Sequence, residues 1–135
     1  RFAQRVIDYF DGDLTGKSIA ILGWAFKANT NDSRESAAIK VSEIIYKTGA
    51  SITIYDPMVQ KRSIANDIES LWETKNNFKD KRINIVEELN ETKQCDAFVI
   101  LTEWEEFKQI DIEESKIIFD GRNINQNKNK ISIGK

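Results

Sequence analysis

Three cationic side chains follow apolar segments, in positions where a parallel sheet would gather them. Lys27 and Arg34 lie in the stretch 21–36, which starts apolar and then turns polar, and Arg122 follows a later apolar run. If the apolar runs are strands of one parallel sheet, their carboxyl ends meet at one edge and ligands bind there. We therefore expect the three cations to converge at that edge.

An anion is the ligand that suits this arrangement. Ser36 is positioned to begin a helix, and the first amides of a helix together with nearby cations bind phosphate or diphosphate well. An aromatic side chain beside them, such as Phe26 or Trp24, is expected to pack against a base or a ribose. Taken singly, each of these residues also has a structural reading, as a solvated cation, a helix cap or a core aromatic.

A self-contained NAD site is not predicted. Asp56 follows an apolar run and resembles the acid that binds a ribose in dinucleotide-binding folds. However, the first polar stretch contains only Gly23 and lacks the G-x-G-x-x-G pattern.

Composition excludes several function classes. The 135 residues include no histidine, which excludes a Ser-His-Asp triad, a Cys-His pair and a histidine metal site. The net charge of -2 gives no basic field for nucleic acid, and no apolar run is long enough to span a membrane. Cys95 is the only cysteine, which excludes an internal disulfide and is compatible with a reducing cytoplasm. With no histidine to activate it, Cys95 is expected to be a small buried residue.

Alternating helical and strand patterns predict an α/β fold. Strands are predicted over 17–23, 51–57, 83–86, 96–102 and 116–120. Helices are predicted over 1–10, 36–49 and 63–72, with a weaker one over 87–94 and a helical turn at 103–107. This alternation indicates βαβ units. The predicted architecture is Rossmann-like and doubly wound, with a mostly parallel sheet and helices on both faces.

Finer expectations concern single elements. Ser36 is the predicted N-cap of the second helix and Gly49 its stop. Trp104 and Phe107 are expected in the core or an interface, and the amide-rich residues 125–135 are expected to be a solvated end. The apolar stripe of the second helix is predicted to consist of Ala37, Val41, Ile44 and Ile45.

Several ordered segments resemble one known family. "ILGWAFKANTNDSRESAAIKVSEII" (21–45) is similar to the segment that opens the C-terminal domain of the UDP-glucose/GDP-mannose dehydrogenases, approximately G-L-A-F-K-x-x-T-D-D-x-R-E-S-P-A. "GASITIYDP", "DAFVILTEWEEF" and "IIFDGRN" resemble three further family segments in the right order, and "ISIGK" resembles the usual ending. The resemblance covers nearly the whole chain. "LTEWEEF" is most similar to the members that act on UDP-glucose.

The resemblance implies a role within a larger enzyme. Those members oxidise the C6 hydroxyl of UDP-glucose twice, reduce two NAD and yield UDP-glucuronate in the cytoplasm. Residues 1–12 would then be the end of a connecting helix and 13–135 the UDP-binding C-terminal domain. The N-terminal NAD-binding domain and the middle region with the catalytic cysteine have no counterpart here, so the chain alone would be inactive. With those domains the polypeptide would be a homodimer.

Site residues carry over by position. The resemblance implies that Phe26, Lys27 and Arg122 contact the nucleotide sugar and that Arg34 lies toward the NAD across the domain cleft. No catalytic or metal-binding residue is implied. The sequence departs from the family pattern at Trp24, Asn31, Ser33 and Ala37.

Two alternatives stay open. One is a paralogous dehydrogenase acting on a UDP-N-acetyl-hexosamine or on GDP-mannose. In the family this domain binds mainly the nucleotide, so it would look alike in enzymes that act on different sugars. The other is a stand-alone receiver-like module. That module needs an acidic pair after its first strand and a lysine after its last, where this sequence has Gly23-Trp24 and Asp120-Gly121-Arg122.

Overall fold

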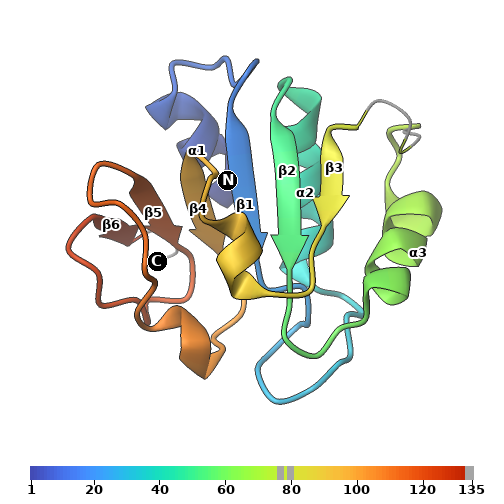
Figure 1. Cartoon of the computed structure of the whole chain (residues 1–135). Coiled ribbons are helices and arrows are strands. Elements are labelled where there is room, and N and C mark those ends of the chain that lie inside the picture. Colours follow the sequence, from blue (N-terminus) through green and yellow to red (C-terminus); the bar gives the residue numbers. More distant parts are fainter. Residues whose placement is uncertain (76–77, 79–80, 133–135) are drawn as a thin grey trace.

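The chain folds around a six-stranded, all-parallel sheet with the strand order β3-β2-β1-β4-β5-β6 (Figure 1). The computed structural model describes residues 1–75, 78 and 81–132. The strands are β1 (Ser18–Leu22), β2 (Ser51–Tyr55), β3 (Ile83–Ile85), β4 (Ala97–Ile100), β5 (Ile117–Asp120) and β6 (Lys130–Ser132). The helices are α1 (Phe2–Tyr9), α2 (Ala37–Lys47) and α3 (Lys61–Leu71), and η2 (Leu89–Thr92) and η3 (Glu105–Phe107) are short 3-10 turns.

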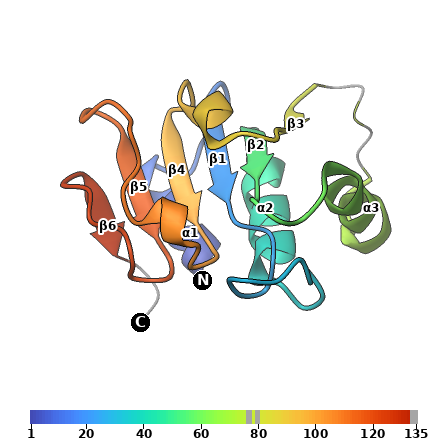
Figure 2. The ribbon, with the colours of Figure 1, turned by 60° about the horizontal axis from the view of Figure 1, so that its bottom comes forward.

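The strand order reverses beside β1. From β1 the chain runs outward through β2 to β3, and then returns to place β4 on the other side of β1. In open α/β sheets, the crevice at such a switch lies outside the carboxyl ends of the strands and is the usual ligand site. In Figure 1 these ends face downward, and the loop that follows β1 projects from them, as Figure 2 shows from below.

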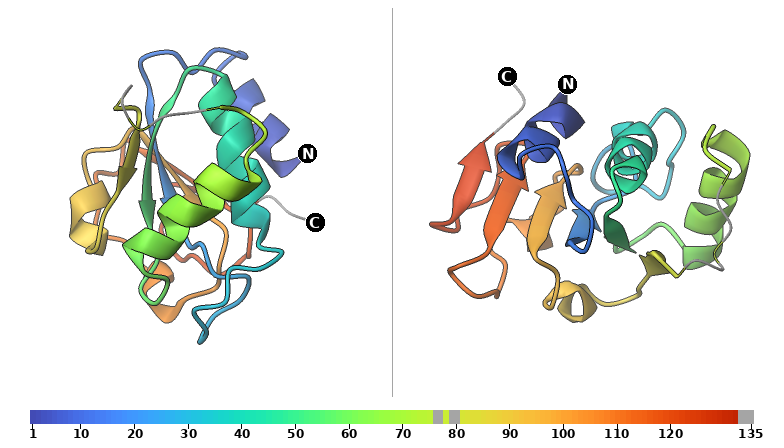
Figure 3. Two further views of the ribbon diagram at one scale, coloured as in Figure 1. Left: turned by 90° about the vertical axis from the view of Figure 1, so that its right-hand side faces the viewer. Right: turned by 90° about the horizontal axis from the view of Figure 1, so that it is seen from above.

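Helical segments cover both faces of the sheet. The left panel of Figure 3 shows α1 and α2 on one face and the short η2 turn on the other, against β2. All residues of β4, and all of β1 after Ser18, are buried, because these central strands are covered on both sides. The predicted doubly wound α/β fold is confirmed. No described helix is both long and apolar enough to cross a membrane.

The start and the end of α2 agree with the sequence, but its buried stripe does not. The Ser36 hydroxyl caps the helix by accepting the Ala38 N–H at 3.1 Å, and Gly49 follows the helix with φ 100°. The predicted stripe is wrong at Ala37, which is exposed, while Ile45 is buried as expected and Val41 and Ile44 are only half-buried. The residues that α2 buries are Ala38, Ser42, Glu43, Ile45 and Tyr46. The stripe is displaced because this helix buries two polar residues, which an apolar pattern cannot reveal.

The amide-rich end is not simply solvated. Residues 130–132 form β6, which pairs in parallel with β5 and forms the edge of the sheet. The side chain of Asn127 bonds the backbone N–H and C=O of Ile110, at 2.9 and 2.8 Å, so amides replace apolar packing here. The prediction of a solvated end is therefore wrong over 130–132 and also at Asn125, which is buried and donates to the Phe107 carbonyl at 2.8 Å. Residues 133–135, which belong to the "ISIGK" resemblance, lie outside the described residues.

Candidate functional site

The loop that joins β1 to α2 (residues 23–36, the β1–α2 loop) begins at a very tight approach to Thr102, which closely follows β4. Gly23 has φ 104° and donates its N–H to the Tyr55 carbonyl at 2.8 Å. A Cβ added at Gly23 would lie 2.4 Å from the Thr102 hydroxyl oxygen and 2.7 Å from the Thr102 backbone nitrogen. The same hydroxyl donates to the Ala25 carbonyl at 2.7 Å. Glycine is therefore required where the chain leaves β1.

Asp56 fixes the base of this loop. One oxygen of its buried carboxylate accepts the backbone N–H groups of Trp24 and Ala25, at 2.7 and 2.9 Å, and the indole N–H of Trp104 at 3.1 Å. The other oxygen accepts the N–H groups of Met58 and Val59, at 2.8 and 2.9 Å. These five donors leave the carboxylate no role in holding a ribose. Its likeness to a ribose-binding acid was misleading, and its function is to position the loop.

The loop closes on itself and presents Phe26 and Lys27. The Phe26 N–H donates to the Asp32 carbonyl at 2.9 Å, which makes a closed turn of residues 26–32. The Phe26 side chain is 41% exposed, and the Lys27 Nζ lies 5.5 Å from its ring centroid. Lys27 has no carboxylate partner within the described part of the chain. A large exposed ring beside an unpaired cation can stack on a base or sugar and attract an anion.

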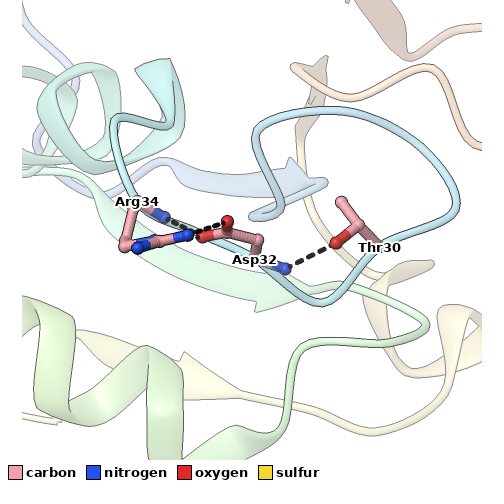
Figure 4. A network of polar contacts seen from close by, with 3 residues as sticks. All are labelled: Thr30, Asp32 and Arg34. Atoms are coloured by element: carbon pink, nitrogen blue, oxygen red, sulfur yellow. Dashed lines mark hydrogen bonds and ion pairs between the residues drawn. The ribbon is translucent and has the colours of Figure 1, made fainter.

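Arg34 is held by a carboxylate of its own loop. Its backbone N–H and its Nε donate to one oxygen of Asp32, at 2.9 and 3.0 Å, and its terminal nitrogen donates to the other at 2.8 Å (Figure 4). Figure 4 also shows the Asp32 N–H donating to the Thr30 hydroxyl. The Arg34 side chain is 86% exposed. The guanidinium is thus oriented by the loop and still accessible from outside.

We expect the Asp32 carboxyl to titrate well below its ordinary range. The side-chain hydrogen bond from Arg34, and next the one from its backbone N–H, lower the pKa of Asp32 from 3.8 to about 2. Because the folded pKa is depressed, the stabilisation by this pair is complete above pH ~4 and is lost as the pH falls through about 2. A carboxyl-carbon NMR titration should give that midpoint, and Arg34→Gln should raise it toward 3.8. An unshifted midpoint in the unaltered chain would show that the pair does not persist in solution.

Trp24 and Ser33 meet at one carboxylate. The Trp24 indole N–H and the Ser33 hydroxyl both donate to the same oxygen of Asp67 in α3, at 2.8 and 2.7 Å. Trp24 is fully buried. The expectation that Trp24 packs against a bound base or ribose is therefore wrong, and Phe26 is the exposed aromatic. Trp24 and Ser33 are two of the four positions at which the sequence departs from the family pattern.

Arg122 lies on a turn organised by Asp120 at the carboxyl end of β5. The buried Asp120 carboxylate accepts four consecutive backbone N–H groups, from Arg122 to Asn125, at 2.6 to 3.0 Å. The Arg122 guanidinium pairs with Glu103 at 2.8 Å, and its side chain is 39% exposed. This pairing fixes the side chain near the end of β4.

The four predicted site residues all follow carboxyl ends of parallel strands, on the β1–α2 loop and on the turn after β5. Phe26 and Lys27 are in direct contact, whereas Arg34 and Arg122 are each paired with a carboxylate. Convergence of the three cations on one anion stays a prediction. Sequence reasoning missed Asp67, because no local pattern marks a residue that bonds a loop many positions away.

Other candidate groups are structural. Cys95 is fully buried, and this burial raises the pKa of its thiol, so it is the small buried residue expected. Trp104 and Phe107 are buried in the core. Burial, and then the hydrogen bond to Glu106, raise the pKa of Tyr55 far above its ordinary range.

Parallel strands that reverse their order at β1, with a braced polar loop at that point, define a Rossmann-like ligand-binding domain. A family model described as the UDP-glucose/GDP-mannose dehydrogenase family, UDP binding domain, matches residues 20–127. The chain belongs to this family.

Relatives from distant organisms agree with this assignment. The UDP-glucose 6-dehydrogenase of Gallus gallus is 40% identical over 134 residues, which cover 92% of this chain and 27% of the relative. A UDP-glucose dehydrogenase structure from Pyrobaculum islandicum has a TM-score of 0.71 at 25% identity and covers 96% of this chain. A UDP-D-ManNAc dehydrogenase structure from Pyrococcus horikoshii has a TM-score of 0.59 at 27% identity and covers 93%. The chain spans only 26–27% of the length of these relatives.

Proposed function

We propose that this chain is the C-terminal, UDP-binding domain of a cytoplasmic, NAD-dependent UDP-glucose 6-dehydrogenase, which converts UDP-glucose to UDP-glucuronate. The exposed Phe26–Lys27 pair on a firmly braced loop is the observation that carries the proposal. The ring offers a stacking surface, and the ammonium is a positive charge with no carboxylate partner among the described residues; together they match a nucleoside diphosphate.

The role of these residues is to hold and orient the substrate. Lys27 would neutralise diphosphate charge, Phe26 would pack against the nucleotide sugar, and Arg122 would contact it from the turn after β5. Fixing one end of a substrate lets its other end meet reactive groups in a defined geometry, and such positioning is worth roughly 7–11 kcal/mol in favourable cases. The C6 hydroxyl would meet those reactive groups on other domains of a longer polypeptide.

The residues of this chain do not fit a resident NAD at β1. The loop has Gly23 without the glycine-rich pattern, and the Asp56 carboxylate is occupied by five donors. We propose that an N-terminal domain binds the NAD and that Arg34 faces it across a cleft. Residues 1–12 would be the end of a connecting helix, residues 13–135 the domain proper, and the full-length enzyme a homodimer.

Lys27→Ala is expected to weaken UDP binding by the full-length polypeptide at least tenfold. The reason is the loss of a charge-assisted contact to phosphate, since hydrogen bonds to charged groups are worth roughly 1.5–3 kcal/mol. Isothermal titration calorimetry with UDP measures the effect. Lys40→Ala is the matched control, because Lys40 is an exposed lysine of α2 outside the loop. Equal affinities of the Lys27→Ala and Lys40→Ala variants would contradict the proposal.

The likeness to a UDP-D-ManNAc dehydrogenase favours a second candidate, a paralogue that uses a UDP-N-acetyl-hexosamine. A GDP-mannose dehydrogenase is the other family alternative. The same titration with UDP-glucose, UDP-N-acetyl-hexosamine and GDP-mannose ranks the three substrates.

A further inference from the structure

The geometry points to Asp67 of α3 as a positioning residue for nucleotide binding, acting through the β1–α2 loop. This inference rests on the proposed function, because the affected ligand is the UDP group that Phe26 and Lys27 would hold. Asp67 itself is not placed in contact with that ligand. Its effect is transmitted by two hydrogen bonds, from the Trp24 indole and the Ser33 hydroxyl, which we call the Asp67 bridge.

The positions of the two donors give the bridge its effect. The bond from the Phe26 N–H to the Asp32 carbonyl closes the turn that presents the Phe26–Lys27 pair. Trp24 lies two residues before this turn and Ser33 immediately after it. The Asp67 bridge therefore fixes the loop segments on both sides of the turn to the same oxygen atom.

The bridge joins the loop to an element that is itself well held. Asp67 is 43 residues from Trp24 and 34 from Ser33 along the chain. Its helix buries Ile64 and Ile68 in the core. At the end of α3 the indole of Trp72 donates to the Ile39 carbonyl of α2 at 3.0 Å. Asp67 thus transfers the rigidity of α3 to a loop that otherwise protrudes from the sheet (Figure 2).

Asp56 and Asp67 have separable roles. Asp56 is buried and bonds backbone groups at the base of the loop, so its loss affects the fold. Asp67 is half-buried and bonds two side chains on either side of the closed turn. Without Asp67, the base remains fixed while the Phe26–Lys27 pair samples more conformations. Binding then requires this lost order to be restored, which lowers affinity.

The test is the Asp67→Ala variant of the full-length polypeptide, with Glu69→Ala as the control. Glu69 is an exposed carboxylate of the same helix. We expect Asp67→Ala to weaken UDP binding about tenfold in calorimetry, which is ~1.4 kcal/mol, and Glu69→Ala to leave it unchanged. Trypsin should also cut faster after Lys27 and Arg34 in the Asp67→Ala variant, as mass spectrometry of the fragments can show.

Two further variants separate positioning from a general loss of structure. Asp67→Asn keeps an oxygen that can accept both donors, and should restore most of the affinity and the protection from trypsin. Ser33→Ala alone should weaken UDP binding. In the Asp67→Ala background it should add nothing, because both changes break the same Asp67 bridge.

The outcomes distinguish this inference from the proposed function. If Lys27→Ala abolishes UDP binding while Asp67→Ala matches Glu69→Ala, the Asp67 inference is wrong and the proposed function stands. Additive effects of Ser33→Ala and Asp67→Ala would also overturn it. If the unaltered polypeptide does not bind UDP at all, both are overturned.

Discussion

Replacing Asp56 with alanine is expected to cost about 3–5 kcal/mol of the free energy of unfolding, the range seen when one partner of a buried charged network is removed. The carboxylate accepts bonds from four backbone N–H groups and from the Trp104 indole. Truncation leaves these donors unpaired in a site from which water is largely excluded, and unpaired buried donors destabilise the folded state. A domain of this size is stable by only about 5–15 kcal/mol in total.

Urea unfolding measures this loss as a lower midpoint with an unchanged slope. Asp32→Ala is the matched control, because Asp32 also accepts backbone and side-chain bonds, but its partner Arg34 is 86% exposed and water screens the pair, so the midpoint should move much less. If Asp56→Ala does not fold, Asp56→Asn gives a measurable intermediate, since it keeps one acceptor oxygen. An Asp56→Ala midpoint equal to that of Asp32→Ala would show that Asp56 does not fix the loop.

Gly23→Ala is expected to be the second most damaging change, with a loss of about 3 kcal/mol or more. The φ of 104° already strains any residue with a Cβ. The added atom would also overlap the Thr102 side chain at 2.4 Å and its backbone nitrogen at 2.7 Å. Thr102 closely follows β4, whose pairing with β1 limits how far the Thr102 backbone can move, so the cost of overpacking adds to the strain.

Gly16→Ala separates the two causes. Gly16 has a similar positive φ of 83°, but a Cβ there would meet nothing within 4 Å. It should lose only about 1–2 kcal/mol, the cost of the left-handed backbone conformation. Thr102→Ala should rescue Gly23→Ala only in part, because the backbone nitrogen remains in the way. Equal losses in the two glycine variants would rule out the close approach to Thr102 as the cause.

The fold could be read from the sequence because its strongest signals are local. The continuous apolar runs of β1 and β4 follow from burial on both faces, and Ser36 and Gly49 are capping residues whose effect reaches only a few positions. The β6 strand was missed because an edge strand needs little apolar character. The segment that leads into it is held by hydrogen bonds of amide side chains, such as those between Asn127 and the Ile110 backbone.

The candidate site could be read only in part. Phe26, Lys27, Arg34 and Arg122 come from motif positions, and the structure places all four at the strand ends expected. What supports them was not predictable, because Asp56, Asp67 and Thr102 act on the loop across 31 to 77 residues of chain. Trp24 shows the limit well. An aromatic in a polar loop is equally compatible with a ligand contact and with burial, and only packing decides between them.

The bonds that brace the β1–α2 loop also have a consequence for the order of folding. Its supports come from residues 56, 67 and 102, which the chain supplies only after the loop itself, and the last of them follows β4. Such distant contacts form late, because loop-closure entropy must be overcome before they stabilise anything. A chain that emerges from the ribosome would therefore acquire the conformation of its ligand-binding loop only after β4 has paired with β1.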